Sequence, residues 1–378
     1  MKLKVDRSTL MKALAHVQNV VEKRNTIPIL ANVLIRAKDG ALTLAATDME
    51  IAAVEQVPAE VTRNGAATAP AATLYEIVRK LTEGATVELD HPGGDAPLAL
   101  RSGRFATSLN CLPVEDFPAI QDGALPHGFG LKAGVLRDLI DRTKFAISTE
   151  ETRYYLNGIY LHATESDGVT VLRAVATDGH RLARVEEPLP DGAAGMPGVI
   201  VPRKTVFELR KLAEDVPGQD EIRIALSETR IRFELGTVTL TSKLIDGTFP
   251  DYERVIPRDN DKFLRIAKKD FAEAVDRVAA ISSERSRPVK LAIAKEGLTL
   301  SAASPDQGRA EEEIERDRLE YDATPIEIGF QARYLRDITE TIGDATRVEF
   351  AFHDHTAPTL IRAEGDASAV YVLMPMRV

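Results

Sequence analysis

The chain contains little that could cross-link it, anchor it in a membrane or build an aromatic core. Cys111 is the single cysteine among 378 residues, which excludes an internal disulfide framework and favours a reducing compartment. Tryptophan is absent and aromatic residues make up 5%, so Leu, Ile, Val and Ala must form most of the core. No stretch approaches the roughly 18 apolar residues of a membrane span, and the N-terminus lacks the apolar stretch of a signal peptide. We therefore expect a cytoplasmic protein without membrane contact.

Motifs of catalysis are missing as well. The sequence has no P-loop, no dinucleotide-binding fingerprint and no Gly-x-Ser-x-Gly motif. Cys111 has no nucleophile motif around it, and we predict that it is a small buried apolar residue. The prediction is a non-enzymatic protein that has no catalytic residues and needs no cofactor or metal.

Two short stretches leave an enzymatic alternative open, a metal phosphohydrolase. Asp178 and His180 could serve catalysis or bind a metal, although Gly179 between them is typical of a strand-end turn. His353 and His355 would share one face of a strand. A zinc site needs three or four ligands, and no further Cys or His lies at motif spacing, so a solvated hairpin end is the simpler interpretation.

One pattern of strand, helix, strand pair, second helix and strand pair occurs three times along the chain. It begins at Met1, near Phe129 and near Phe263, so its period is about 130 residues. A solenoid repeat has roughly 20–50 residues, whereas this period has the size of a domain. The recurring landmarks are Thr47-Asp48, Thr177-Asp178 and Pro305-Asp306 at strand ends, Pro70, Pro202 and Gln331 before second helices, and Phe117-Pro118 and Phe249-Pro250 after last strands.

Each copy is predicted to be an α+β domain in which two helices lie on one side of a continuous antiparallel sheet. The predicted domains cover residues 1–122, 129–256 and 257–378. The predicted helices cover residues 7–24, 73–81, 134–147, 203–214, 268–281 and 331–342. Ser8 and Thr9 are candidate N-caps of the first helix.

Hairpin turns are predicted at the same place in each copy. Asp39-Gly40 separates two alternating apolar stretches, and Asp-Gly is a strong signal for a two-residue hairpin turn. Asp167-Gly168 and Glu296-Gly297 occupy the corresponding positions of the second and third copies.

The charge pattern distinguishes the predicted helices from the rest of the chain. The net charge of −10 alone disfavours a nucleic-acid partner. The predicted helices nevertheless hold 18 Lys and Arg against 11 Asp and Glu, although those of the third copy are near neutral. Basic helices on an acidic body suit a protein that presents helices to a polyanion and repels it elsewhere. The simpler alternative is that helices tolerate Lys and Arg well.

Two further stretches are candidates for binding rather than catalysis. Arg153-Tyr154-Tyr155 could hold a phosphate and lie against a base or sugar, although a Tyr in a strand more often packs. The C-terminal stretch from Tyr371 to Val378 is mostly apolar and contains two methionines, which suit adaptable binding surfaces. It predicts either a last core strand or the lip of a groove for partner peptides.

These stretches together resemble the bacterial sliding clamps, the beta subunits of DNA polymerase III, over the whole length of the chain. The strings that carry the resemblance, in the family's order, are Ile27-Pro28-Ile29-Leu30, Arg153-Tyr154-Tyr155-Leu156-Asn157-Gly158, Ala176-Thr177-Asp178-Gly179-His180-Arg181-Leu182, Val199-Ile200-Val201-Pro202-Arg203-Lys204, Thr241-Ser242-Lys243-Leu244-Ile245-Asp246-Gly247, Phe249-Pro250-Asp251-Tyr252 and Tyr371-Val372-Leu373-Met374-Pro375-Met376-Arg377. The resemblance implies three DNA-clamp domains per chain and a head-to-tail homodimer that closes a ring around double-stranded DNA. It also implies a processivity factor that binds the replicative DNA polymerase, the clamp loader and repair or translesion proteins through short linear peptides.

The resemblance also implies three sets of site residues. The implied DNA contacts are Arg24, Tyr154, Tyr155, Arg203 and Lys204. The implied partner-peptide groove comprises Leu156, Thr177, Gly179, His180, Arg181, Leu182, Pro250, Arg254, Val255, Gln331, Tyr334, Val372, Met374, Pro375, Met376 and Arg377. The implied dimer interface comprises Arg104, Phe105, Thr107, Ala280 and Ile281.

The sequence departs from the family pattern at four places. Ala72-Thr73 stands where the family has a basic residue, and Glu150 stands where it can have Gln before the Arg-Tyr-Tyr string. Ser286 replaces an aromatic residue of the groove. Thr107 replaces an interface phenylalanine, and Phe105 on the same strand face is expected to take over its packing.

Simple geometry favours two chains per ring. Six helices packed roughly 10 Å apart in a circle leave only about 9 Å of free space, too little for a duplex of about 20 Å. Twelve helices leave roughly 27 Å. Contacts to phosphates hold any sequence nearly alike, so such a ring slides. The remaining alternative is a scaffold of three repeats that does not bind DNA.

Overall fold

The computed structural model describes residues 1–22, 26–120, 123–281, 288–343 and 346–377. These residues form two compact units, each with its own core. The first unit comprises Met1–Arg137, Pro190–Pro197 and Lys204–Leu244, and the second comprises Asp138–Leu189, Gly198–Arg203 and Ile245–Val378. Each unit therefore contains one terminal copy of the repeat and a part of the central copy.

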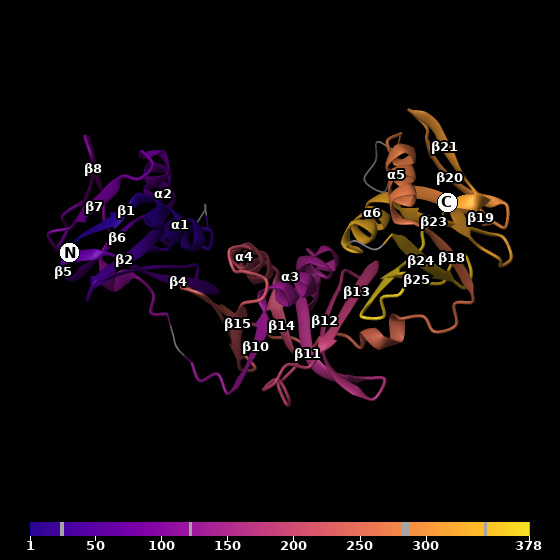
Figure 1. Cartoon of the computed structure of the whole chain (residues 1–378), viewed down its shortest axis with the longest axis horizontal. Helices are drawn as coiled ribbons and strands as arrows, with labels where there is room; N and C mark the ends of the chain where they lie inside the picture. The colour runs from indigo at the N-terminus through magenta and orange to yellow at the C-terminus, as the bar shows by residue number, and fades with distance from the viewer. Residues whose placement is uncertain (23–25, 121–122, 282–287, 344–345, 378) are drawn as a thin grey trace. The chain divides into compact units, whose positions relative to one another are not determined.

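The order of the elements repeats three times (Figure 1). The first copy contains β1 Lys2–Asp6, α1 Arg7–Gln18, η1 Pro28–Ala31, β2 Asn32–Lys38, β3 Ala41–Thr47, β4 Ile51–Pro58, β5 Glu60–Arg63, β6 Gly65–Pro70, α2 Ala71–Lys80, β7 Thr86–Asp90, β8 Leu98–Ser102, β9 Phe105–Leu109 and η2 Val114–Asp116. The second contains β10 His127–Lys132, α3 Ala133–Asp141, η3 Lys144–Ala146, η4 Glu151–Leu156, β11 Gly158–Ser166, β12 Val169–Thr177, β13 Arg181–Pro188, β14 Val199–Pro202, α4 Arg203–Glu214, β15 Glu221–Leu226, β16 Arg230–Leu235, β17 Val238–Lys243 and η5 Tyr252–Val255. The third contains β18 Lys262–Ala267, α5 Lys268–Ala279, β19 Pro288–Ala294, β20 Gly297–Ser304, β21 Gly308–Glu315, η6 Arg316–Arg318, β22 Leu319–Glu320, β23 Ile326–Gln331, α6 Ala332–Thr341, β24 Arg347–Phe352, β25 Thr359–Ala363 and β26 Ala369–Leu373.

All six predicted helices are confirmed, and the largest differences are in α1 and α3, which end several residues earlier than predicted. Helix α1 ends at Gln18 because the amides of Val20 and Val21 bond to carbonyls three residues back, which tightens the chain into a turn. Helix α3 ends at Asp141, and a 3₁₀ turn replaces its predicted last residues. The six helices of the described residues therefore hold 14 Lys and Arg against 10 Asp and Glu, a smaller positive excess than predicted.

The N-cap of α1 is Asp6, so the predicted candidates Ser8 and Thr9 lie two and three residues too late. The Asp6 carboxylate accepts hydrogen bonds from the backbone amides of Ser8 and Thr9, at 2.8 and 3.1 Å. Ser8 and Thr9 are thus donors to the cap, not the cap itself. An Asp at this position also carries negative charge to the positive end of the helix dipole.

The strands form four antiparallel sheets, two in each unit. The first unit holds a sheet of order β5-β1-β7-β8-β9 and one of order β10-β15-β16-β17-β4-β3-β2-β6. The second unit holds a sheet of order β14-β11-β12-β13-β26-β25-β24-β18-β22 and one of order β21-β20-β19-β23. In each unit the larger sheet joins two copies, through β17 beside β4 and through β13 beside β26.

The predicted Asp-Gly hairpin turns are confirmed. Asp39 and Gly40 have φ of 51° and 79°, and Asp167 and Gly168 have φ of 49° and 80°. Positive φ at both central residues is the geometry of a type I′ turn, whose twist matches that of the flanking strands.

Helices α1 and α5 pack in the same way within their own units. Helix α1 buries Leu10, Leu14 and Val17 against α2 and against strands of both sheets of its unit. Helix α5 likewise packs against α6 and buries Phe271, whose ring centre lies 4.9 Å from that of Phe350. Each such side chain contributes roughly 1.5–3 kcal/mol by burial. No helix of the described residues is long and apolar enough to cross a membrane.

Candidate functional site

An apolar cluster in the second unit brings together residues that lie far apart in the sequence. Its buried members are Leu156, Val175, Leu182, Ile200, Phe249, Tyr252, Val370 and Val372. We call these residues the groove cluster. Leu156, Leu182 and Val372 were predicted for the peptide groove, and they come from η4, β13 and β26. The pairing of β13 with β26 places Leu182 directly opposite Val372.

Five members of the groove cluster were not predicted. Phe249 is buried and stacks on Tyr160, with ring centres 4.9 Å apart, and Tyr252 lies edge-on to Phe249 at 6.3 Å. The Phe-Pro pair that recurs after the last strands of the first two copies was the available signal for Phe249. Val175, Ile200 and Val370 carry no such signal, because their apolar alternation is shared with every other core strand.

The turn that follows β12 borders the groove cluster. The Asp178 carboxylate accepts hydrogen bonds from the amides of His180 and Arg181, at 2.9 and 3.0 Å, and the Thr177 hydroxyl donates to the Arg181 carbonyl at 2.7 Å. Gly179 has φ of +88°, and an added Cβ would lie 2.5 Å from Nη1 of Arg153. Asp178 therefore forms a strand-end turn, which was the simpler interpretation of this hexapeptide.

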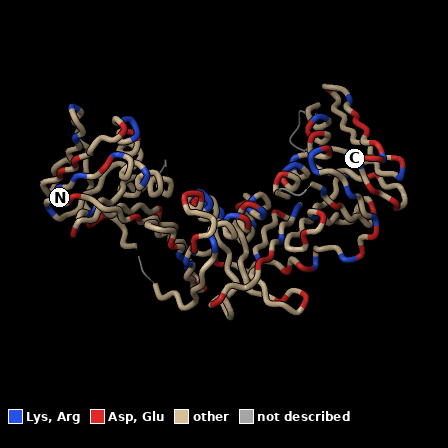
Figure 2. Tube along the Cα trace, in the orientation of Figure 1, with Lys and Arg blue, Asp and Glu red and all other residues tan. Residues whose placement is uncertain are grey.

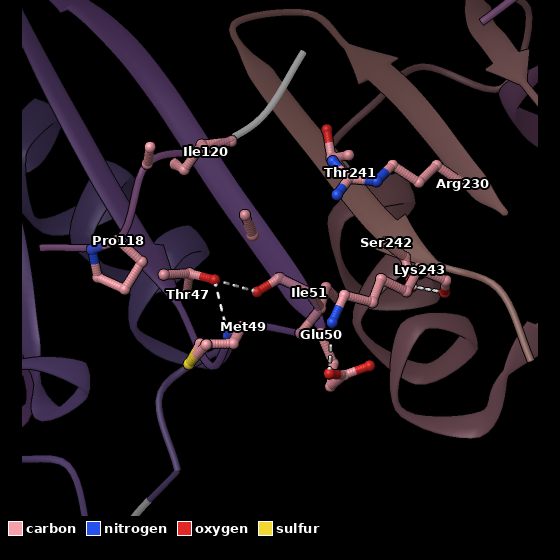
Figure 3. Close-up of a pocket in the computed structure, with 12 residues that line it drawn as sticks. Thr47, Met49, Glu50, Ile51, Pro118, Ile120, Arg230, Thr241, Ser242 and Lys243 are labelled. Carbon is pink, nitrogen blue, oxygen red and sulfur yellow. Dashed lines mark hydrogen bonds and ion pairs between the residues drawn. The ribbon is translucent and has the colours of Figure 1, made fainter. Parts of the chain in front are cut away.

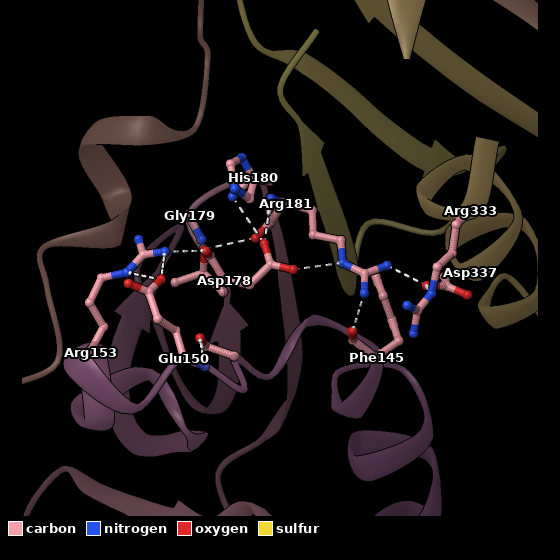
Figure 4. Close-up of polar contacts among 11 residues, drawn as sticks. Phe145, Glu150, Arg153, Asp178, Gly179, His180, Arg181, Arg333 and Asp337 are labelled. Carbon is pink, nitrogen blue, oxygen red and sulfur yellow. Dashed lines mark hydrogen bonds and ion pairs between the residues drawn. The ribbon is translucent and has the colours of Figure 1, made fainter. Parts of the chain in front are cut away.

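Arg181 is buried and fastens the turn to α6 (Figure 4). Its guanidinium donates to the carboxylates of Asp178 and Asp337 and to the carbonyl of Phe145. It also lies over the ring of Tyr334, with Cζ 4.3 Å from the ring centre. Every donor group thus has a charged or polar acceptor, which is what a buried cation requires.

The exposed residues near the groove cluster form a rim. His180 is exposed and its ring lies 6.4 Å from that of Tyr334, while Met374 is 40% exposed and its amide donates to the His180 carbonyl at 2.9 Å. The amide of Met376 donates to the carbonyl of Gly329 at 2.8 Å, which ties the C-terminal stretch to β23. The other predicted rim residues are Pro250, Arg254, Val255 and Arg377, all exposed, and Pro375 and Gln331, both half-buried. The C-terminal stretch is thus both a core strand and a rim.

A polar network contacts the groove cluster at the hydroxyl of Tyr252. The hydroxyl of Tyr252 accepts from Arg173 at 2.7 Å and contacts Nε2 of His162 at 2.9 Å. Arg173 also forms an ion pair with Glu186 at 2.7 Å. Burial, together with the nearby Arg173 charge, lowers the pKa of His162 to about 4. His162 is therefore neutral at pH 7.

The residues predicted to contact DNA have different environments. Tyr154 is 53% exposed and lies edge-on to the half-buried Tyr155, with ring centres 5.8 Å apart. Both belong to the 3₁₀ segment η4 and not to a strand. Arg203 is the first residue of α4, and Arg24 lies outside the described residues.

Lys204 is less available than predicted. Its ammonium group contacts the buried carboxylate of Asp48, the Val20 carbonyl at 3.0 Å and the Glu22 carboxylate at 3.3 Å. Three acceptors match its three protons, so Lys204 ties α4 to the turn after β3 within the first unit. These bonds count against Lys204 as a DNA contact, which stays a prediction.

Many helical cations have carboxylate neighbours, so the helices carry both signs of charge (Figure 2). Arg79 contacts Glu76 at 2.8 Å, and Lys211 contacts Glu208 at 2.8 Å. An exposed pair such as Arg79 with Glu76 is weak, so a phosphate can compete with the carboxylate, whereas Glu208 is buried.

Residues predicted for the dimer interface lie at the edge strand β9 in the first unit and just after helix α5 in the second unit. Within the described residues, β9 and β21 are each the outermost strand of a sheet. Phe105 is 44% exposed on β9, and Thr107 is half-buried on the same strand face. Arg104 precedes β9 and is exposed, while Ala280 and Ile281 follow α5 and are exposed and half-buried.

The metal alternative finds no support in the described residues. They contain no group of three or more His, Cys, Asp or Glu that could hold a metal ion. His353 and His355 lie in the bend between β24 and β25 and not on a strand, so the prediction of a shared strand face was wrong. Asp354 between them is held by the amide and hydroxyl of Thr356 and by the amide of Ala357, which lower its pKa to about 2. The prediction of a solvated hairpin end is confirmed.

Cys111 has the character of a structural residue. It is half-buried, less buried than predicted, and burial raises the pKa of its thiol. A raised pKa keeps the thiol protonated and unreactive at pH 7.

Comparisons with known proteins identify the class of protein. Three family models of the DNA polymerase III beta subunit match the chain. The N-terminal domain matches residues 1–121, the central domain 130–251 and the C-terminal domain 253–377. The chain therefore belongs to the DNA polymerase III beta subunit family. It has three beta-clamp domains and the function of a sliding clamp in DNA replication, which is that of a non-catalytic processivity factor.

Individual relatives agree over their full lengths. The beta sliding clamp of Caulobacter vibrioides is 50% identical over 378 residues, with 100% of both chains covered. That of Escherichia coli is 36% identical over 379 residues, again with 100% of both chains covered. The crystal structure of a sliding clamp from Bartonella birtlesii, bound to griselimycin, is 48% identical and superposes with a TM-score of 0.96 over 100% of both chains.

Proposed function

We propose that two copies of this chain form a head-to-tail ring around double-stranded DNA and tether the replicative polymerase to it. The clamp loader and repair or translesion proteins would bind the same ring through short linear peptides. The observation that carries the proposal is the groove cluster with its exposed rim, which offers apolar anchoring positions to a peptide. We place the domains at residues 1–122, 129–256 and 257–378, and the protein in the cytoplasm.

The two sheet edges support the ring. An outermost strand presents unpaired backbone groups, so β9 of one copy and β21 of another can complete each other's ladder. Their charges are complementary, because Arg101 on the adjacent β8 and Arg104 just before β9 are exposed, while Glu311, Glu313 and Glu315 are exposed on β21. Joining unlike edges head to tail makes two identical joints, and the ring closes.

The DNA contact is proposed to be sequence-independent. Tyr154, Tyr155 and Arg203 offer a stacking ring, a hydroxyl and a guanidinium, which suit sugar and phosphate but not base edges. Arg24 stays a candidate on the family resemblance alone. Since no register on the duplex is preferred, the ring would slide, and topology would hold it in place.

Retention on circular DNA tests the ring directly. The protein is loaded onto nicked circular DNA, separated by gel filtration, and the DNA is then linearised with a restriction enzyme. We expect the protein to stay with the circle and to leave the linear product. Equal retention on both forms would contradict a topological ring and support ordinary DNA binding.

The joint is tested by light scattering on the Phe105→Asp variant, with Val169→Asp as matched control. Both residues are exposed hydrophobics, but only Phe105 lies on β9. We expect Phe105→Asp to run as a monomer and Val169→Asp as a dimer. A dimeric Phe105→Asp protein would remove β9 from the joint.

A further inference from the structure

The first unit contains a turn that is built like the one beside the groove cluster. After β3, the Thr47 hydroxyl donates to the Ile51 carbonyl at 2.9 Å, as Thr177 does to Arg181. The Asp48 carboxylate accepts hydrogen bonds from the amides of Glu50 and Ile51, at 2.9 and 2.8 Å. Asp178 accepts from the amides of His180 and Arg181 in the same way. The two turns therefore occupy equivalent places in the first and second copies.

The neighbouring strands extend this correspondence. Strand β17 pairs with β4 so that Thr241 lies opposite Ala52, and β26 pairs with β13 so that Val372 lies opposite Leu182. Ala52 and Thr241 thus occupy the positions that Leu182 and Val372 have in the groove cluster. Pro118 follows a buried Phe in the first copy as Pro250 does in the second.

A pocket of about 280 Å³ lies at this equivalent place (Figure 3). Its lining includes Thr47, Met49, Ile51, Ala52, Pro118 and Thr241. The smaller Ala52 and Thr241 leave space where Leu182 and Val372 fill the other unit. The volume is at the lower limit of small-molecule pockets and suits one or two side chains of a peptide.

Met49 marks this pocket as more than a packing defect. It is 52% exposed although it is a large apolar residue, and it has φ of +77°, where the equivalent Gly179 has φ of +88°. A non-glycine residue is strained at this φ, because its Cβ crowds the following carbonyl oxygen. Strained residues of this kind cluster at binding sites, where the neighbouring structure holds them in place.

The rim sets the charge of the occupant. Arg230 and Lys243 line the pocket on one side, and Glu50 is the one acidic residue among the lining residues described. Lys243 and Glu50 form an exposed pair at 2.8 Å, which is weak and exchangeable. A peptide carboxylate can therefore replace Glu50 beside Lys243, next to an apolar anchor in the pocket.

Only a short anchor fits, because side chains of α4 are bonded to the turn and to β17 on the side where α6 leaves a rim in the second unit. In the first unit Lys204 binds Asp48, whereas the equivalent helical position in the second unit is Arg333, which lies 3.7 Å from Asp337. Thr205 replaces Tyr334, and its hydroxyl bonds to Ser242 at 2.7 Å. The rim made by His180 and Tyr334 in the second unit has no counterpart here.

We propose that the pocket formed by Met49, Ala52 and Thr241 is a second peptide-docking site, which takes an aliphatic or aromatic anchor next to an acidic residue. It goes beyond the proposed groove and would bind a second segment of an extended partner. One anchor at an open pocket yields weak binding, with a dissociation constant on the order of 1 mM.

The six methionines supply reporters for both places. Protein labelled with ¹³C at the methionine methyl groups is titrated with the peptide acetyl-Asp-Leu-Phe-amide and followed by NMR. We expect a saturable shift of the Met49 methyl signal with millimolar peptide. Met374 and Met376 report on the groove independently, and Met11 is an internal reference on α1.

Filling the pocket provides the control. Ala52→Leu places the side chain of Leu182 at the equivalent position and should abolish the Met49 shift while the Met374 shift persists. Ala72→Leu makes the same change at an exposed position of α2 and should alter neither. Thr241→Glu adds a carboxylate to the half-exposed face of β17, and we expect at least tenfold weaker binding at Met49.

The outcomes separate the two sites. A Met49 signal that does not move at millimolar peptide, or that moves equally in Ala52→Leu and Thr241→Glu, would overturn the second site. In that case a moving Met374 signal would leave the proposed groove intact. A Met49 shift without any Met374 or Met376 shift would support the second site and count against the groove.

Discussion

The guanidinium of Arg181 on β13 stacks on the ring of Tyr334 on α6, with 4.3 Å between Cζ and the ring centre. The two residues are more than 150 positions apart, and their contact joins the turn before β13 to α6 within the second unit. A guanidinium fits this position because it donates hydrogen bonds in its plane and stacks on an aromatic ring through its face. Lys could make neither the same set of bonds nor the stack.

Removing the Arg181 side chain should destabilise the second unit strongly. Arg181→Ala leaves Asp178, Asp337 and the Phe145 carbonyl without their donor, and breaking a buried ion pair costs roughly 3–5 kcal/mol. Arg333→Ala removes a guanidinium that is 71% exposed, and we expect a change of about 0–1 kcal/mol. Urea unfolding followed by circular dichroism measures both, and equal stabilities of the two variants would contradict a structural role for Arg181.

Gly179→Ala should disturb the groove through Arg153. The new Cβ must adopt φ of +88° and approach Nη1 of Arg153 to 2.5 Å, so Arg153 has to leave the Asp178 carbonyl to which it donates. Gly168→Ala is the matched control, because Gly168 has φ of +80° but nothing within 4 Å of an added Cβ. We expect both variants to lose about 1–2 kcal/mol of stability, and only Gly179→Ala to weaken binding of a polymerase tail peptide in fluorescence polarisation. Equal peptide affinities would show that Arg153 has no part in the groove.

Met374 should be an anchor of the rim. Met374→Ser removes a flexible apolar side chain that is 40% exposed, so the fold should tolerate it, and we expect peptide affinity to fall about tenfold. Val169→Ser removes an exposed apolar side chain from the start of β12 and should leave the affinity unchanged. Isothermal titration calorimetry with a polymerase tail peptide compares them, and an unchanged affinity of Met374→Ser would exclude this residue from the site.

His16 should make the first unit less stable as pH rises. Burial opposes charge on His16, but its bonds to Glu55 at 2.8 Å and Asp215 at 2.9 Å outweigh burial and raise the pKa of its imidazole. A raised folded pKa means that the native state binds more protons, so the extra stability is present below the unfolded pKa of about 6.5 and is lost as pH passes the folded pKa. The free energy of unfolding should therefore decrease above pH 6.5 in the native protein and not in His16→Gln. A pH-independent difference between the two proteins would refute this linkage.

The sequence predicted those features that depend on local pattern. The six helices, the Asp-Gly turns and the turn formed by Asp178 follow from apolar spacing and turn chemistry within a few residues. Helix ends were less predictable, because the early end of α1 depends on whether Val20 and Val21 bond three or four residues back.

Contacts between residues far apart in the chain could not be predicted from the sequence. Nothing in the sequence around Lys204 shows that Asp48 will bind it, so this internal ion pair could not be predicted. The stack of Arg181 on Tyr334 depends in the same way on two strands and a helix from different copies meeting in one unit. The groove residues themselves were identified through family resemblance, since alternation on a strand does not separate a groove wall from a core.

Because each larger sheet joins two copies, the chain should keep its fold after a proteolytic cut between copies. Strand β17 pairs with β4 over five residue pairs, and β13 pairs with β26 over five. A protease cut in the connection between the first and second copies, for example after Gly123, would sever the covalent path but leave this backbone ladder and its core in place. The fragments should then stay together until denatured, so a nicked chain would keep its native mass in solution while showing two bands on a denaturing gel.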